Sequence, residues 1–237
     1  MVDLVVRCWA DGLDFIGTPI HRKDNVTAGR TGFGDMICEV SNVCMSPFFE
    51  EGGTVLAPNY HSAHKKFIDL LPVDMSHWNW ISNRAEYNQI TRKSRDWNSL
   101  NEIRPILHCH SVYEEYVKLD KGKFIECNDL VDTTTEYATI QRVPFARKCQ
   151  YTQDHIKKME DQYQLKIIEI GGNEKLGMNK VAYIIDKAKY HIGIDSGMSH
   201  FALTVKNKED VHIYVPKQRQ TSVCYRWIKN GYNVKLI

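Results

Sequence analysis

Residues 190–202 have the sequence YHIGIDSGMSHFA. The run His191–Ile194 is largely apolar, the triplet Asp195–Gly197 follows it, and residues 198–205 have the composition of a short helix. This order predicts a buried β-strand, a tight turn and a helix that begins at once. In open parallel sheets, ligands bind at the carboxyl ends of the strands, and a helix N-terminus at that edge offers free N–H groups to a phosphate. The stretch therefore predicts an α/β fold with a phosphate-binding turn.

Three residues of this turn have the chemistry to hold a phosphate. Ser196 can donate its hydroxyl, Gly197 lets a ligand approach the backbone closely, and His200 falls in the first turn of the helix. The same triplet also suits an ordinary helix, with Asp195 as its N-cap and His200 on the surface. The triplet alone leaves both interpretations open.

The rest of the second half alternates strand and helix patterns. Strands are predicted at residues 137–141, 166–170, 191–194, 211–215 and 234–237, and helices at 152–163, 178–188 and 198–205. Gly171 and Gly172 end the second of these strands. Alternation of this kind predicts a parallel, doubly wound sheet.

The first half contains similar βαβ units. Strands are predicted at residues 4–6, 54–57 and 106–109, helices at 35–48 and 64–71, and a Gly-rich loop at 9–34. The expected linker region lies at 112–132. We therefore expect two α/β domains, residues 1–130 and residues 131–237.

Composition and charge narrow the functional class. Residues 1–130 hold 14 Lys/Arg and 18 Asp/Glu, a net charge of −4, whereas residues 131–237 hold 17 and 11, a net charge of +6. A basic second half suits a polyanionic ligand such as a nucleotide or a nucleic acid, although an ordinary solvated surface can have the same charge. Scattered cysteines without a CxxC pair, no signal peptide and no membrane-spanning apolar run predict a cytoplasmic protein.

Two segments resemble the heptosyltransferase-like glycosyltransferases. Residues 181–203 contain that family's helix, strand and D-[ST]-G-x-x-H-x-A pattern, with every fixed position present. Gly32-Phe33-Gly34-Asp35 is similar to the family's G-x-G-D loop, which opens its first helix. The matched regions occur in the family's order and cover about half of the chain.

The resemblance implies a GT-B fold, in which two Rossmann-like lobes with parallel sheets face a central cleft. A nucleotide sugar, which we expect to be a UDP-sugar, would bind the C-terminal lobe. Arg147 or Lys148, with Arg142 as a rival, would supply the positive charge that a departing diphosphate needs. The expected donor-binding residues are Arg147, Lys148, Gly171, Asp195, Ser196, Gly197 and His200.

The resemblance also implies the catalytic base and the absence of a metal. In the family the Asp of G-x-G-D is the proposed general base, which here is Asp35, within an acceptor-side loop that includes Gly32, Phe33 and Gly34. The alternative role of Asp35 is a helix N-cap. No D-x-D triplet occurs in the chain, and metal-dependent sugar transferases use that triplet to hold Mg²⁺ or Mn²⁺. We therefore expect metal-independent transfer with no cofactor beyond the nucleotide-sugar co-substrate.

The acceptor is less well defined. The resemblance implies a bacterial surface glycan or lipopolysaccharide, but some phage enzymes of the same two-lobed class glycosylate hydroxymethylated bases in DNA. Such an enzyme needs cations for phosphates and aromatic side chains that replace base stacking. Residues 77–97 and 217–227 combine Trp, Tyr, Arg and Lys in this way. We expect a hydroxymethylated base in phage DNA, in the host cytoplasm; the alternative is surface loops with half-buried tryptophans.

Other functions are compatible with the same residues. A nucleotide-sugar epimerase or hydrolase would share the site at Asp195–His200 but would not need Asp35. A binding module without enzymatic activity would have neither transfer nor donor hydrolysis. A flavodoxin-like or dinucleotide-binding fold is a weaker option because no G-x-G-x-x-G follows a strand. The sequence does not indicate an oligomeric state.

Overall fold

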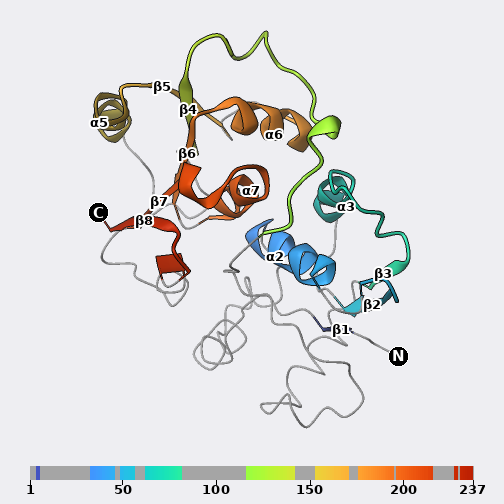
Figure 1. The fold of residues 1–237 in the computed structure, drawn as a ribbon. Helices are drawn as coiled ribbons and strands as arrows, with labels where there is room; N and C mark the ends of the chain where they lie inside the picture. Colours follow the sequence, from blue (N-terminus) through green and yellow to red (C-terminus); the bar gives the residue numbers. More distant parts are fainter. Residues whose placement is uncertain are drawn as a thin grey trace, which may run out of the picture. The chain divides into compact units, whose positions relative to one another are not determined.

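The computed structural model describes residues 4–5, 33–45, 49–56, 62–81, 116–141, 153–170, 176–194, 196–215, 227–228 and 230–236. The chain divides into two compact units, Met1–Val117 and Lys118–Ile237. Each unit contains a parallel β-sheet with helices in the connections between its strands (Figure 1). The chain is therefore a mixed α/β protein, as the alternation of patterns predicts.

The described part of the first unit contains a three-stranded parallel sheet in the order β1-β2-β3. The strands are β1 (Leu4–Val5), β2 (Gly53–Leu56) and β3 (Trp78–Ile81), and the helices are α2 (Phe33–Cys44) and α3 (Ser62–Ile68). Ile37, Val40 and Val43 of α2 are fully buried. Their spacing places them on one helical face, which explains why this sequence forms a helix against a core.

Strand β3 is an element that the sequence pattern did not predict. Its first residue, Trp78, is 5% exposed, and its indole Nε1 donates to the carbonyl oxygen of Phe49 at 2.9 Å. A buried Trp needs such an acceptor, because its N–H otherwise loses the hydrogen bond that water provides. Trp78 is therefore a core residue, and its expected role as a stacking side chain for DNA is wrong.

The second unit is built on a five-stranded parallel sheet in the order β5-β4-β6-β7-β8. The strands are β4 (Tyr137–Ile140), β5 (Lys166–Glu169), β6 (Tyr190–Ile194), β7 (Val211–Val215) and β8 (Asn233–Leu236). Numbered within this unit, the order is 2-1-3-4-5, that of flavodoxin-like doubly wound sheets. It is equally the Rossmann order 3-2-1-4-5-6 without its outermost strand.

Helices cover both faces of this sheet. Helix α5 (Gln153–Tyr163) lies on one face, and α6 (Met178–Lys187) and α7 (Gly197–Val205) lie on the other (Figure 1). The core on the α5 face consists of Ala138, Ile140, Ile156, Met159, Ile167, Ile192, Ile194 and Tyr214. On the opposite face, the hydroxyl of Tyr137 donates to the carbonyl of Ile184 in α6 at 2.8 Å.

Helix α7 packs closely on β6 at Gly193. A Cβ atom built on Gly193 would overlap the Oγ of Ser199, which donates to the carbonyl of Ile194 at 2.5 Å. We expect Gly193→Ala to lower the free energy of unfolding by about 1–3 kcal/mol, because overpacking forces α7 to shift. Urea denaturation measures this loss.

The matched control for that change is Gly122→Ala. There the new Cβ would meet only the exposed carboxylate of Asp120, at 3.2 Å from its Oδ1. This control should unfold at nearly the same urea concentration as the unmodified protein. Equal stability of the Gly193→Ala variant would contradict the close packing of α7 on β6.

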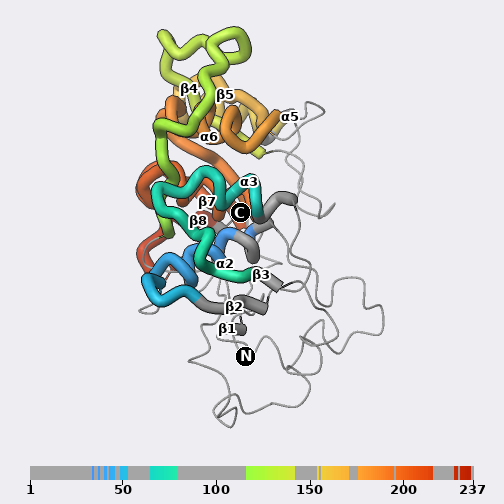
Figure 2. The backbone as a smooth tube through the Cα atoms, turned by 90° about the vertical axis from the view of Figure 1, so that its right-hand side faces the viewer, coloured from blue at the N-terminus to red at the C-terminus, as the bar shows by residue number. Residues whose placement is uncertain are grey.

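The segment that follows Val117 belongs to the second unit, whereas the predicted boundary lay at residue 130. The amide of Leu119 donates to the carbonyl of Thr204 in α7 at 3.0 Å, and the amide of Ile125 donates to Asn179 in α6 at 3.4 Å. The segment follows these two helices before it enters β4 (Figures 1 and 2). These contacts explain why residues 118–130 group with the C-terminal sheet.

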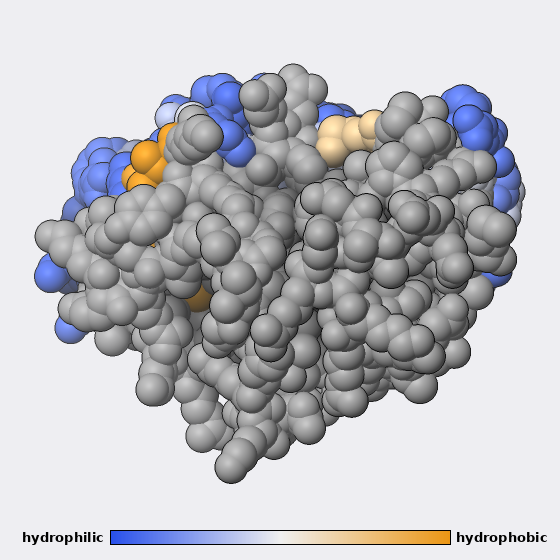
Figure 3. Space-filling model, turned by 90° about the horizontal axis from the view of Figure 1, so that it is seen from below, coloured by the Kyte–Doolittle hydropathy of each residue, from blue (hydrophilic) through white to orange (hydrophobic). Residues whose placement is uncertain are grey.

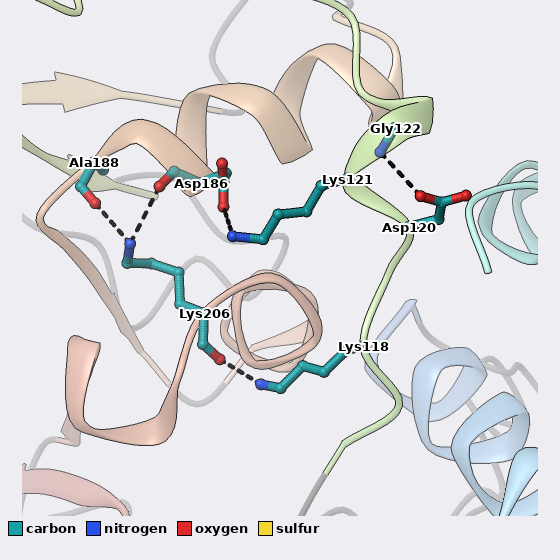
Figure 4. A network of polar contacts seen from close by, with 7 residues as sticks. All are labelled: Lys118, Asp120, Lys121, Gly122, Asp186, Ala188 and Lys206. Atoms are coloured by element: carbon teal, nitrogen blue, oxygen red, sulfur yellow. Dashed lines mark hydrogen bonds and ion pairs between the residues drawn. The ribbon is translucent and has the colours of Figure 1, made fainter. Parts of the chain in front are cut away.

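Lysine side chains hold this segment against the C-terminal ends of α6 and α7 (Figure 4). Lys118 Nζ donates to the carbonyls of Leu203 at 2.8 Å and Lys206 at 2.6 Å. Lys206 Nζ donates to the carbonyl of Ala188 at 2.6 Å, and Lys121 pairs with Asp186 Oδ1 at 2.6 Å. The last carbonyls of a helix lack partners within the helix, and lysines satisfy them while complementing the helix dipole.

Candidate functional site at the carboxyl edge of the second sheet

The sheet order places the ends of β4 and β6 side by side. From β4 the chain leads to β5 on one side, and the return connection brings β6 to the other side of β4. This reversal is a topological switch point, and ligands of doubly wound sheets bind outside the carboxyl ends of the strands there. Gln141 follows the end of β4, and Ser196 follows the end of β6 by two residues.

Ser196 is the N-cap residue of α7, but its side chain does not cap the helix. Its backbone is extended, with φ −151° and ψ 164°, and no helix amide donates to its hydroxyl. Instead, Ser196 Oγ donates to Gln141 Oε1 at 2.8 Å. Sequence reasoning did not single out Gln141, because only the strand order shows that it faces the turn before α7.

The amides of Gly197 and Met198, the first two of α7, have no hydrogen-bond acceptor among the described residues. The amides of Ser199 and His200 donate to the carbonyl of Ser196 at 3.1 and 3.4 Å. Free amides at the positive end of a helix dipole attract anions. The edge of the sheet at β4 and β6 can thus accept a negatively charged group.

His200 is buried, which excludes the interpretation that placed it on the surface. It is 6% exposed, and its ring lies against that of Trp227, with 5.0 Å between the centroids and a tilt of 54°. Trp227 is itself fully buried. The expectation that Trp227 stacks on a DNA base is therefore wrong, because its ring packs in the core beside α7.

Two titratable groups, the buried His191 in β6 and the partly buried Cys44 in α2, are not available for proton transfer at neutral pH. His191 is fully buried, its Nδ1 lies 3.0 Å from Thr139 Oγ1, and its Nε2 has no hydrogen-bond partner among the described residues. Burial lowers the pKa of His191 to about 3, because desolvation disfavours the imidazolium. Burial also raises the pKa of the Cys44 thiol to about 12, so this cysteine is not a thiolate nucleophile.

A cavity of about 250 Å³ lies elsewhere in the second unit, where α6 and α7 end. Lys118, Lys121, Lys206, Asp186 and Asp210 are among its lining residues. The ammonium groups of the three lysines already bind helix carbonyls or Asp186. We therefore regard this cavity as a consequence of helix capping, at the edge opposite to the switch point.

Several predicted site residues fall outside the described part of the chain. These residues are Gly32, Arg147, Lys148, Gly171 and Asp195. In the first unit, α2 begins at Phe33, two residues before the predicted start, so Asp35 is the third residue of the helix and not its N-cap. Gly34 is partly exposed in the same turn, and the side chains of Phe33 and Asp35 are not described.

The described residues form neither a metal-ligand cluster nor a membrane-spanning helix. These side chains include no group of three or more His, Cys, Asp or Glu that would share a metal ion. None of the described helices combines the length and the apolar composition that crossing a membrane requires. Seen from below, the described residues at the surface are mostly hydrophilic, with a few apolar ones between them (Figure 3).

Comparison with known proteins gives a distant likeness to a solved structure. No protein-family model matches the chain, and no curated protein matches it in sequence. A similar solved structure is the bacterial iron-containing dodecameric glycosyltransferase TibC from enterotoxigenic E. coli H10407, with 10% identity and a TM-score of 0.44. The match covers 91% of this chain and 58% of the TibC chain, so this chain spans less than two thirds of that protein.

Proposed function

We propose that this protein is a glycosyltransferase that moves a sugar from a nucleotide-sugar donor to a hydroxyl acceptor. The observation that carries the proposal is the position of the turn before α7. It joins β6 to a helix with open amides, beside the end of β4, at the switch point of a parallel sheet. A diphosphate is the kind of group that such a helix end binds.

The sequence motifs favour a nucleotide sugar over other phosphorylated ligands. The turn belongs to the pattern D-[ST]-G-x-x-H-x-A, and no G-x-G-x-x-G follows a strand. In our proposal Asp195, Ser196, Gly197 and His200 hold the donor. Arg147 and Lys148 lie in the segment that leaves β4, and Gly171 lies in the segment that leaves β5. Both segments begin at the same edge as the turn, which supports their inclusion.

The proposed chemistry divides between helix α2 of the first unit and helix α7 of the second unit. A hydroxyl is a weak nucleophile at neutral pH, so Asp35 in the first turn of α2 accepts its proton as the acceptor oxygen attacks the anomeric carbon. The bond from that carbon to the donor's phosphate oxygen breaks, and the diphosphate leaves with the electron pair. The N-terminal end of α7 and the cations Arg147 or Lys148 stabilise that charge without a metal.

Two tryptophans proposed to contact a DNA acceptor are buried. Burial of Trp78 and Trp227 removes two of the aromatic side chains expected to stack on a DNA base. The side chains of Trp80, Trp97 and Tyr225 lie outside the described part. We therefore propose a hydroxyl acceptor, with a hydroxymethylated DNA base and a bacterial surface glycan as the two arms of the acceptor test.

The experiment that tests the function is a thermal-shift screen of nucleotide sugars, with UDP-sugars first, followed by a transfer assay with each acceptor class. A donor that binds the folded state raises the melting temperature in proportion to its occupancy. The expected result is one donor that stabilises the protein and is consumed only when its acceptor is present. A protein stabilised by none of the common nucleotide sugars would refute the proposal.

Removing the Ser196 hydroxyl should weaken donor binding. Ser196→Ala deletes a hydrogen bond to a charged phosphate, worth about 1.5–3 kcal/mol, so Kd should rise about tenfold or more by calorimetry. Combining it with His200→Ala should weaken binding further; because His200 is buried, circular dichroism must first show that this variant is folded. Unchanged nucleotide affinity in the Ser196→Ala variant would contradict the site.

The matched control changes the same residue types in the first unit. Ser76 and His77 are exposed and lie just before β3. A Ser76→Ala and His77→Ala variant should therefore bind the donor like the unmodified protein. An equal loss in this control would point to a general effect on folding.

A further inference from the structure

An N-cap serine normally uses its side chain to satisfy the start of its own helix. Its hydroxyl oxygen accepts a hydrogen bond from the second or third helical amide, which in α7 are those of Met198 and Ser199. The backbone of Ser196 fulfils this role, since its carbonyl accepts from Ser199 and His200. Its side chain does not, although its extended backbone conformation is the one that caps adopt.

Gln141 explains why the side chain of Ser196 does not cap α7. The parallel pairing of Ile140 with Ile192 brings the end of β4 next to β6, so Gln141 reaches the turn that follows β6. Its Oε1 accepts the hydroxyl of Ser196 at 2.8 Å, and this hydrogen bond turns the hydroxyl away from the helix. Among the described residues, the amides of Gly197 and Met198 are left without an acceptor.

We infer that Gln141 is a positioning residue that prevents Ser196 from capping α7 and so keeps the first amides of the helix open for the donor's diphosphate. The inference rests on the proposed function. A serine hydroxyl that capped the helix would compete with the phosphate for the amide of Met198, and a side-chain cap is worth a factor of about five in equilibrium. When the donor binds, the hydroxyl turns from Gln141 and donates to the phosphate.

The test is a double-mutant cycle on the full chain. Gln141→Met keeps the length of the side chain and removes its hydrogen bond, so Ser196 becomes free to cap α7. We expect the Kd for UDP and for inorganic pyrophosphate to rise about fivefold by calorimetry. In the Gln141→Met and Ser196→Ala double variant no hydroxyl remains to compete, so its affinity should equal that of Ser196→Ala alone within about twofold.

Amide hydrogen exchange follows the same change without any ligand. The amides of Met198 and Ser199 should exchange more slowly in the Gln141→Met variant than in the unmodified protein, and this protection should vanish in the double variant. Gln162→Met, on the exposed side of α5, is the matched control and should change neither affinity nor exchange.

The outcomes separate this inference from the function on which it rests. Additive losses in the double variant would overturn it, because they would mean that Gln141 acts on the ligand directly. Unchanged exchange at Met198 and Ser199 in the Gln141→Met variant would overturn it as well. If exchange slows as expected but neither UDP nor pyrophosphate binds the unmodified protein, the role of Gln141 in orienting Ser196 stands and the proposed function fails.

Discussion

Asp35→Asn should lower the rate of sugar transfer by about 10²–10⁴-fold, the contribution typical of a general base, while the donor Kd stays within about twofold. The amide has nearly the shape of the carboxylate but cannot take the acceptor's proton. Only the rate of the transfer step, in which the acceptor reacts, should therefore fall. Initial rates with saturating donor and acceptor, together with calorimetry of the donor alone, measure the two effects separately.

The control for this prediction lies on the same helix. Glu39→Gln makes the same carboxylate-to-amide change within α2, and it should leave transfer unchanged. Near wild-type turnover of the Asp35→Asn variant would show that Asp35 is not the base. Consumption of the donor by both proteins without any acceptor would instead indicate an epimerase or hydrolase.

Acidification from pH 7 to pH 5 should lower the free energy of unfolding by about 2 kcal/mol through His191 alone. Burial holds the folded-state pKa of His191 at about 3, whereas the unfolded value is about 6.5. As pH falls below the unfolded pKa, the unfolded chain binds a proton that the folded protein cannot. The contribution of neutral His191 to stability is therefore fully present above its unfolded-state pKa. This contribution is lost progressively as the pH falls toward the folded-state pKa of about 3. Urea denaturation at several pH values measures this slope.

A double substitution isolates the contribution of His191. Thr139→Val with His191→Phe removes both partners of the buried hydrogen bond, and apolar replacements of similar shape are close to neutral. This variant should match the unmodified protein at pH 7.5 and lose less stability at pH 5. His212, whose pKa burial and Lys235 also lower, still contributes to the remaining loss. An identical pH dependence in both proteins would contradict the shifted pKa.

The local order of elements could be predicted from sequence, whereas their lateral order could not. Strand β6 and helix α7 follow from their apolar residues and from the turn Asp195–Gly197 between them. Strand β3 escaped prediction because it has only four residues within a polar segment, and its structure depends on pairing with β2. Its buried indole is satisfied by Phe49, which lies 29 positions earlier in the chain.

The candidate site, like the fold, could be predicted from sequence only in part. The turn at Ser196 could be recognised from its residue types, but its partner Gln141 could not, because the two meet only through the adjacency of β4 and β6. The direction in which the Ser196 hydroxyl points could not be predicted from sequence either. A hydroxyl that caps a helix and one that turns to a neighbouring strand have the same sequence context, and the difference decides whether the amides are open.

The lysines at the ends of α6 and α7 determine where the C-terminal half can be separated for independent study. A fragment that begins at residue 131 would discard Lys118 and Lys121 and strip the carbonyls of Leu203 and Lys206 of their donor. A fragment that begins at Tyr116 would retain these bonds and the pairing of Leu119 with Thr204. Spectroscopists who want isotope-labelled samples of this half should therefore start the gene about fifteen codons earlier than the strand pattern suggests.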